Sequence, residues 1–141
     1  MSKIIYSAHA TSSGGRSGHG RTDDGVLDVT LTTPKEMGGD GARGTNPEQL
    51  FAVAYSACFL GALKVVAGKE GVRIPEDATV TATINFTDRD TGPGFWISGA
   101  LEVKVPGMDR AQVEDLVQKA HVVCPYSEVS RNGFDVDLKV A

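Results

Sequence analysis

Cysteine is scarce in this sequence, and its scarcity narrows the possible chemistry. The 141 residues contain two cysteines, Cys58 and Cys124, with no CxxC pair and no His/Cys set at metal-ligand spacing. This spacing gives no support to a zinc site, so no bound metal or cofactor is expected. The start of the chain lacks a secretory signal pattern, which predicts a cytoplasmic protein in which a permanent disulfide is disfavoured. The two thiols are therefore expected to be either catalytic or inert.

Clustered positive charge and long uninterrupted apolar runs are also missing. The chain has 14 basic and 18 acidic residues, a net charge of -4, and no Lys/Arg cluster able to neutralise a row of phosphates. Nucleic acid is therefore not an expected partner. The most apolar stretch is interrupted by Tyr55, Ser56 and Lys64, so it falls short of the roughly 18 to 20 apolar residues of a membrane span. No membrane association is expected.

The residue patterns predict an α+β fold. A chain of 141 residues has the size of one domain and nothing divides it, so residues 1–141 are expected to form a single domain. Alternating and β-branched residues predict strands at 3–12, 25–33, 79–90, 95–106 and 133–140. The glycine-rich residues 13–25 are expected to form a loop or an irregular hairpin end, and "DTGPG" a hairpin turn. Hairpins rather than helical crossovers favour an antiparallel sheet.

Two helices are predicted between these strands. The first begins after Asn46, a capping residue followed by Pro47 at the first helical position, and stops at Gly68 or Gly71. The second lies within residues 108–124, with Asp109 as its cap, and the proline that follows forbids its extension.

The first helix is unusual because it is apolar on nearly every face. A surface helix normally carries one apolar stripe, so this helix must be surrounded by other protein. One further helix and a few short strands offer little cover. A second copy of the chain is therefore expected to complete it.

Cys58 lies in the middle of this apolar helix. A lone buried cysteine is often an ordinary small core residue, and apolar surroundings alone raise the pKa of a thiol. Reactivity would need a cation, and Lys64 lies on the far side of the helix. Arg16 and Arg21 are better candidates, because the glycines around them let the backbone approach another element closely. The same glycines lack a phosphate-binding GxxxxGK[ST] or GxGxxG pattern.

Four stretches together identify a family resemblance. They are "GGRSG", "GVLDVTLTTPKEMGG", "TNPEQLFAVAYSACFLGAL" and "VCPYS". These stretches resemble the organic hydroperoxide resistance (Ohr) proteins of the OsmC superfamily, from about Tyr6 to the last predicted strand. The resemblance implies a thiol-dependent peroxidase and an intertwined homodimer in which antiparallel sheet wraps around two central helices.

The resemblance also implies roles for four residues. Cys58 matches the peroxidatic cysteine and Cys124 the resolving cysteine, which condenses with the oxidised Cys58 to a disulfide. Arg16 matches the arginine that holds the thiolate, and Glu48 the carboxylate that orients it. Two positions depart from the family pattern: Ser17 stands where an acidic residue is common, and Ala54 where glycine is common. A dithiol, typically a lipoyl group on a carrier protein, is the implied external reductant.

The spacing of Glu48 and Cys58 raises a geometric difficulty. Ten residues of unbroken helix cover about 15 Å, a distance that one arginine does not readily span. We therefore predict an interruption in the helix between these residues. A continuous helix from 47 through 67 would count against the assignment of Glu48.

Aromatic residues indicate the class of substrate. They offer an apolar wall for an alkyl or fatty acyl hydroperoxide, although each could equally be core packing. These residues are Phe51, Phe59, Phe95, Trp96 and Tyr126.

Two other functions fit the residues. A cysteine hydrolase or acyl transferase would pair Cys58 with His121 and would not need Cys124. A non-catalytic dimer that binds a small molecule would use both thiols only structurally.

Overall fold

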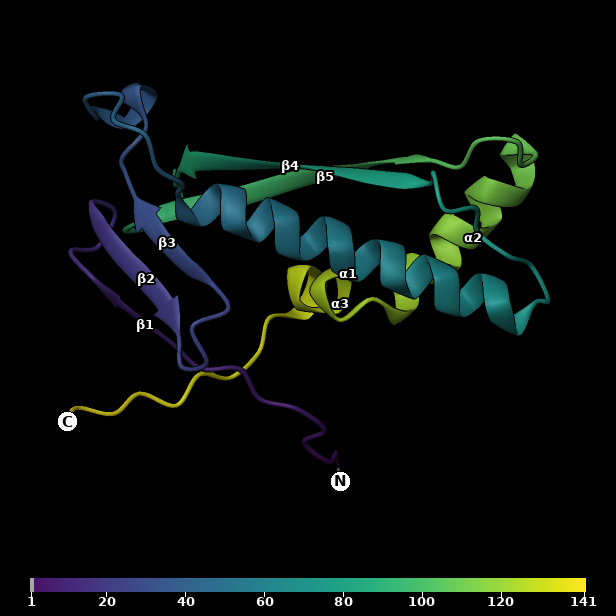
Figure 1. Cartoon of the computed structure of the whole chain (residues 1–141), viewed down its shortest axis with the longest axis horizontal. Helices are drawn as coiled ribbons and strands as arrows, with labels where there is room; N and C mark the ends of the chain where they lie inside the picture. Colours follow the sequence, from purple (N-terminus) through teal and green to yellow (C-terminus); the bar gives the residue numbers. More distant parts are fainter. Residues whose placement is uncertain (1) are drawn as a thin grey trace. The chain divides into compact units, whose positions relative to one another are not determined.

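The computed structural model describes residues 2–141 (Figure 1). The chain folds as two compact units, one that ends at Leu50 and one that extends from Phe51 to Ala141. Helices and antiparallel strands occur in one chain, which confirms the predicted α+β class. The single domain over residues 1–141 crosses this division and stays a prediction.

The N-terminal unit contains an antiparallel sheet in the order β1-β2-β3. Its strands are β1 (Ala10–Ser13), β2 (Gly18–Thr22) and β3 (Asp28–Leu31), and the short 3-10 helix η1 (Lys35–Met37) follows them. The expected first and second strands are therefore shorter than predicted. The expected loop or irregular hairpin end over residues 13–25 is confirmed only for the turn at residues 14–17, because β2 lies inside the rest of this stretch. Glycine has low β-propensity, but here the backbone ladder with both neighbours holds the strand.

The second unit consists of a β-hairpin and helices. The long helix α1 (Pro47–Lys69) begins at the end of the first unit, and Figure 1 shows the β4–β5 hairpin alongside it. Strands β4 (Thr79–Asp88) and β5 (Phe95–Lys104) pair along their whole length in antiparallel register, as predicted. Two further helices follow, α2 (Arg110–Val123) and α3 (Pro125–Asn132).

The ends of the helices follow the predicted capping chemistry. The Asn46 side chain accepts a hydrogen bond of 2.8 Å from the backbone N–H of Gln49 at the start of α1. Gly71, with φ of +71°, takes the left-handed conformation just beyond Lys69. Asp109 accepts a bond of 3.2 Å from the N–H of Gln112 and so caps α2.

Helix α1 is continuous, and the predicted interruption between Glu48 and Cys58 is wrong. The residues between them include no proline, and alanine and leucine favour helix at several of these positions. The backbone therefore keeps its regular hydrogen bonding through this segment.

The C-terminal part of the chain differs from the prediction in two ways. The sequence predicted no helix after α2, but helix α3 begins at Pro125. Proline ends a preceding helix, and it also suits the first position of a new one. Residues 133–140 form no strand in this chain, although their apolar residues alternate. The side chains of Phe134, Val136, Leu138 and Val140 are exposed.

The core of the second unit lies along one stripe of α1. Tyr55, Phe59 and Leu63 recur at helical spacing and pack with Leu116 and Ala120 of α2. Apolar side chains of β4 and β5 cover this cluster; they are Val80, Ala82, Ile84, Leu101 and Val103. Other apolar faces of α1 stay open in the single chain, with Val53 67% and Val65 55% exposed.

By length and apolarity alone, α1 could cross a membrane, contrary to the sequence expectation. Its most apolar window has a mean hydropathy of 1.9 despite the polar residues within it. The core helix of a soluble protein meets the same criterion, so this property carries little weight. The buried stripe of α1 is the more informative feature.

Replacement of Leu63 by alanine tests the importance of this stripe. The Leu63 side chain is 0% exposed, so Leu63→Ala should lower the free energy of unfolding by about 2–5 kcal/mol through lost contacts and a residual cavity. Urea unfolding at a fixed protein concentration measures the change. The neighbouring Lys64 is exposed, and Lys64→Ala should change stability by less than about 0.5 kcal/mol. Equal effects of the two substitutions would contradict this description of the core.

Candidate active site

Arg16 lies in the tight turn between β1 and β2. Gly14 and Gly15 both have positive φ, +74° and +61°, and the N–H of Ser17 bonds the carbonyl of Gly14 at 3.2 Å. A Cβ at Gly18 would lie 2.0 Å from the carbonyl oxygen of Ser13. The glycines predicted to allow close backbone approach therefore form a compact turn that presents the arginine.

Arg16 and Glu48 form a two-pronged ion pair within the first unit. The Nη1 and Nη2 groups of Arg16 donate to Oε2 and Oε1 of Glu48 at 2.8 and 2.7 Å. The bridge between Leu31 and Thr45 holds the start of α1 beside β3, which brings Glu48 into reach. The hydrogen bonds to Arg16 lower the pKa of Glu48, and the same bonds raise the pKa of Arg16. Both groups are therefore charged across the physiological range.

The continuous helix separates this ion pair from Cys58. Glu48 and Cys58 are ten residues apart on α1, about 15 Å along an unbroken helix. The sequence analysis predicted a break in this helix if Glu48 acts beside Cys58. The continuity of α1 therefore counts against Glu48 acting beside Cys58 of its own chain. The structure thus brings Arg16 to Glu48, as the resemblance implied. Helix α1 has no break that would bring Glu48 close to the Cys58 thiol.

The two cysteines lie together in the second unit. Cys58 is on α1, and Cys124 is the residue between α2 and α3, where the chain turns before Pro125. Their Sγ atoms are 3.6 Å apart, and both residues are thiols. Cys124 is completely buried, whereas Cys58 is partly exposed. Oxidation of Cys58 would therefore place a second sulfur within reach of the modified atom.

The surroundings of Cys58 within this chain favour the neutral thiol. Burial raises the pKa of Cys58 most strongly, and the Cys124 thiol raises it further. The backbone N–H of Tyr126, in the first turn of α3, bonds to Cys58 and lowers this pKa, but it does not offset the burial. A reactive thiolate at Cys58 would therefore need a positive charge in addition to these groups.

The five predicted wall residues fall into two groups. The backbone N–H of Tyr126 bonds Cys58, and the Tyr126 ring lies 5.8 Å from that of Phe51 in an edge-on arrangement, while Phe59 is almost fully buried in the core. Phe95 and Trp96 lie at the turn end of the hairpin, where Phe95 packs on Phe86 and Trp96 lies under Arg89. The structure therefore associates Phe51 and Tyr126 with the thiols.

Residues that the sequence analysis passed over connect the helices around the cysteines. Ser127 of α3 is fully buried, and its hydroxyl bonds both Tyr55 Oη at 2.9 Å and His121 Nδ1 at 2.8 Å. His121 thus bonds Ser127. A hydrolase would instead pair His121 with Cys58. The "VCPYS" stretch contains Ser127, but a single serine after a helix start gives no signal of burial.

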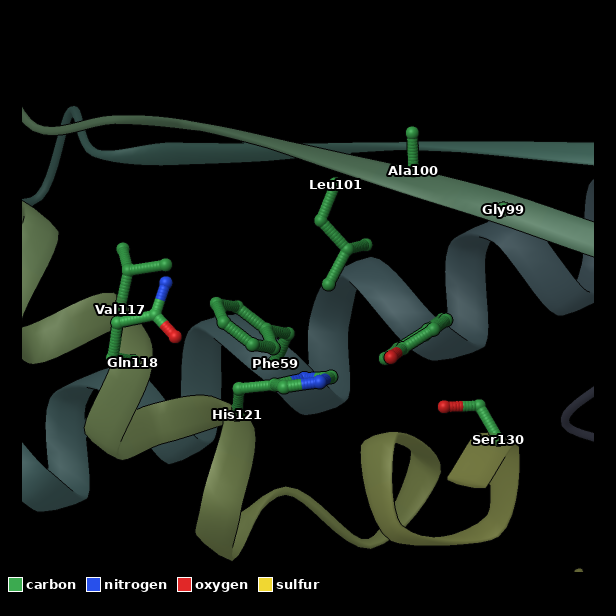
Figure 2. A pocket seen from close by; sticks show the side chains of 9 residues that line it. Phe59, Gly99, Ala100, Leu101, Val117, Gln118, His121 and Ser130 are labelled. Carbon is green, nitrogen blue, oxygen red and sulfur yellow. The ribbon is translucent and has the colours of Figure 1, made fainter. Parts of the chain in front are cut away.

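A cavity of about 300 Å³ is lined by Tyr55 and Phe59 of α1. Figure 2 shows the rings of Phe59 and His121 at this cavity, with Leu101 reaching in from β5 and Ser130 at the edge. Its walls are mainly apolar. Within residues 2–141, no group of His, Cys, Asp and Glu side chains is arranged to hold a metal ion.

The two positions that depart from the family pattern cause no disturbance here. The Ser17 hydroxyl lies 3.1 Å from that of Thr33, beside the Arg16 turn. Ala54 lies within the regular part of α1, so its backbone is ordinary helix.

Comparison with known proteins places this geometry in a family. The family model described as OsmC-like protein matches residues 38–139. The organic hydroperoxide resistance protein of Xanthomonas axonopodis pv. citri is 46% identical over 139 residues, which covers 99% of this chain and 96% of the relative.

Solved structures give the same result. An organic hydroperoxide resistance protein from Legionella pneumophila superposes with a TM-score of 0.85 at 40% identity, over 93% of each chain. The protein OhrB of Bacillus subtilis superposes with a TM-score of 0.84 at 40% identity, over 96% of this chain and 98% of that one. The chain therefore has the OsmC-like fold and belongs to the organic hydroperoxide resistance proteins of the OsmC superfamily.

Proposed function

We propose that the protein is a thiol-dependent peroxidase that reduces organic hydroperoxides to alcohols through a Cys58–Cys124 disulfide. The observation that carries this proposal is the distance of 3.6 Å between the two sulfur atoms. A partly exposed sulfur next to a buried one suits a peroxidatic and a resolving cysteine, in that order. The family supports a role in organic hydroperoxide resistance.

The reaction proceeds in two steps on this pair. The Cys58 thiolate attacks one oxygen of the hydroperoxide, the O–O bond breaks, and the departing alkoxide takes a proton to become the alcohol. Cys58 is left as a sulfenic acid. The Cys124 sulfur then attacks the Cys58 sulfur, and the hydroxyl group leaves as water with the proton of the Cys124 thiol. The resulting disulfide protects Cys58 from irreversible oxidation.

An external dithiol resets the enzyme by reducing this disulfide and becoming a disulfide itself. A lipoyl group on a carrier protein is the reductant that the family resemblance implies. No cofactor bound to the protein takes part in this scheme, and a cytoplasmic location, where such carriers and reduced thiols coexist, fits it.

The positive charge that activates Cys58 comes from a second copy of the chain. The Cys58 surroundings within one chain raise its pKa, and Glu48, the partner of Arg16, lies ten residues before Cys58 on the unbroken helix. In a homodimer, the partner subunit's Arg16 supplies the missing charge, with the partner subunit's Glu48 fixing the direction of its guanidinium. A planar guanidinium can bind a carboxylate with two donors while others face sulfur and peroxide.

Exposed apolar residues support the homodimer. Val53 and Val65 are open on α1, and the apolar residues of the segment 133–140 alternate without a neighbouring strand in the same chain. Such segments match a strand that pairs across a subunit interface. The N-terminal residues Ile4, Ile5 and Tyr6 are similarly exposed.

The substrate is an organic rather than a small hydrophilic peroxide. The Phe51 and Tyr126 rings form an apolar wall, and the backbone N–H of Tyr126 contacts Cys58. An alkyl or fatty acyl chain lying on this wall gains about 0.8 kcal/mol for each buried CH2. The alternative of a cysteine hydrolase lacks this support, because His121 bonds Ser127.

Intact-protein mass spectrometry tests the reaction directly. Reduced protein treated with an equimolar amount of an alkyl hydroperoxide should lose two hydrogens, and peptide mapping should locate a Cys58–Cys124 disulfide. Cys124→Ser should instead gain oxygen at Cys58, because no second thiol lies within reach. An unchanged mass of the reduced wild-type protein would overturn the proposed function.

Replacement of Arg16 tests the source of the activating charge. Arg16→Lys keeps a positive charge but loses the two-pronged bond to Glu48, so the rate of Cys58 oxidation should fall by about 100-fold or more. The pKa of Cys58, followed by the ultraviolet absorbance of the thiolate, should rise. Stopped-flow kinetics with an alkyl hydroperoxide measures the rate.

Arg21→Lys is the matched control, since Arg21 lies on β2 in the same sheet and is 3.8 Å from Asp28. This variant should react like wild type. Hybrid dimers of Arg16→Lys and Cys58→Ser subunits should regain activity if the charge crosses the interface. Hybrids that stay inactive would contradict the arrangement between subunits.

The length of the substrate chain tests the apolar wall. The value of kcat/KM for alkyl hydroperoxides should exceed the value for hydrogen peroxide. It should rise by up to about fourfold for each CH2 added to the alkyl chain until the wall is covered. Phe51→Ala should flatten this dependence. Phe95→Ala removes an equal ring at the hairpin end and should leave it steep. If kcat/KM still rose steeply with chain length in Phe51→Ala but not in Phe95→Ala, the substrate chain would bind at the hairpin and not at the Phe51 wall.

A further inference from the structure

A buried hydrogen-bonded network joins the three helices beside the cysteine pair. The Ser127 hydroxyl of α3 lies between Tyr55 Oη of α1, at 2.9 Å, and His121 Nδ1 of α2, at 2.8 Å. Ser127 is fully buried and Tyr55 is 8% exposed. Buried polar groups are costly unless they are satisfied, so this network favours one relative placement of the three helices.

The network shares its two main elements with the thiols. Tyr55 precedes Cys58 by three residues on α1, and Ser127 follows Cys124 by three residues at the start of α3. Residues three apart lie on the same side of a helix. The Tyr55–Ser127 bond and the Cys58–Cys124 contact are therefore two neighbouring connections between the same pair of elements.

The cap residue and the first turn of α3 carry two groups that contact the Cys58 sulfur. One is the Cys124 Sγ atom and the other is the backbone N–H of Tyr126. Disulfide formation requires the two sulfur atoms to move from 3.6 Å to about 2.05 Å in a specific geometry. The position of this turn relative to α1 therefore controls how often the sulfur atoms meet productively.

A contact outside the network keeps α3 attached to α2. Arg131 of α3 donates to the backbone carbonyl of His121 on α2 at 2.9 Å, and an ion pair of 2.7 Å with Glu128, within α3, holds the Arg131 side chain in place. Loss of the Tyr55 hydroxyl should therefore loosen the first turn of α3 without releasing the helix. This separation of effects makes the role of the network measurable.

We propose that Tyr55, Ser127 and His121 are positioning residues for the disulfide-forming step, acting through the placement of Cys124. This inference rests on the proposed function. In that step the Cys124 sulfur displaces the hydroxyl group of the Cys58 sulfenic acid, the S–S bond forms, and water leaves with the Cys124 proton. The network takes no part in the attack on peroxide.

The experiment separates the two steps in a single turnover. Tyr55→Phe and Ser127→Ala are treated with an alkyl hydroperoxide, quenched at intervals and weighed intact. Loss of the Cys58 thiol should keep the wild-type rate, whereas disulfide formation should slow by about tenfold. The delayed sulfenic acid should accumulate and, with excess peroxide, appear as sulfinic acid.

Ser130→Ala is the matched control. Ser130 lies on the same helix at the cavity of Figure 2, and its hydroxyl bonds only the backbone carbonyl of Ser127 among the interactions described for residues 2–141. This variant should form the disulfide at the wild-type rate. The double variant Tyr55→Phe/Ser127→Ala should be no slower than Ser127→Ala alone, because the two hydroxyl groups act as one unit.

Oxidised glutathione tests the network without peroxide. Cys58 attacks this disulfide, which releases one reduced glutathione and leaves the other bound to Cys58 as a mixed disulfide. Cys124 then displaces the second glutathione and closes the Cys58–Cys124 bond. Tyr55→Phe should slow the release step by a similar factor of about ten. This result would stand even if the wild-type protein failed to react with peroxides, so failure of the proposed function and failure of the inference are distinguishable.

Two results would overturn the inference. One is a folded Tyr55→Phe variant that closes the disulfide at the wild-type rate with both oxidants. The other is an equal slowing of thiol loss and disulfide formation, which would indicate a general effect on structure. Thermal unfolding of each reduced variant shows which proteins are folded, and Tyr55→Phe, which removes one oxygen atom, remains informative if Ser127→Ala does not fold.

Discussion

The rigidity of one helix governs how this site can be assembled. Helix α1 carries Glu48 near its start and Cys58 near its middle, and its unbroken backbone fixes their separation. Arg16 is committed to the Glu48 end by two short hydrogen bonds. Glu48 and Cys58 lie ten residues apart on one unbroken helix, so local adjustment cannot bring them together. The arrangement is resolved if a second subunit brings its own arginine to the sulfur, and the exposed apolar surface of the single chain is consistent with this requirement.

The sequence predicted the local features whose causes are themselves local. Asn46 and Asp109 cap helices through their own side chains, and the β4–β5 hairpin follows from alternating residues around a glycine-rich turn. Cys58 and Arg16 were singled out from the residues themselves, whereas Glu48 and the roles of all four residues came from the resemblance. In the structure the two thiols lie in contact and the arginine and glutamate form an ion pair.

The missed features depend on contacts between distant residues. Strand β2 consists largely of glycine and polar residues, and pairing with β1 and β3 makes it a strand. The segment 133–140 alternates like a strand but finds no neighbour in its own chain. Ser127 gave no signal because its importance lies in burial against Tyr55 and His121. The predicted helix break is wrong for a local reason: the residues between Glu48 and Cys58 include no proline, and several of them favour helix.

The high pKa of Cys58 within one chain has a consequence for the life of the protein. The surroundings of Cys58 within one chain favour the protonated sulfur, and in this form the sulfur is a poor nucleophile. If association supplies the activating charge, the thiol of an unassembled subunit reacts slowly with oxidants and is protected from unwanted oxidation. The thiol would then become reactive only when the subunits assemble.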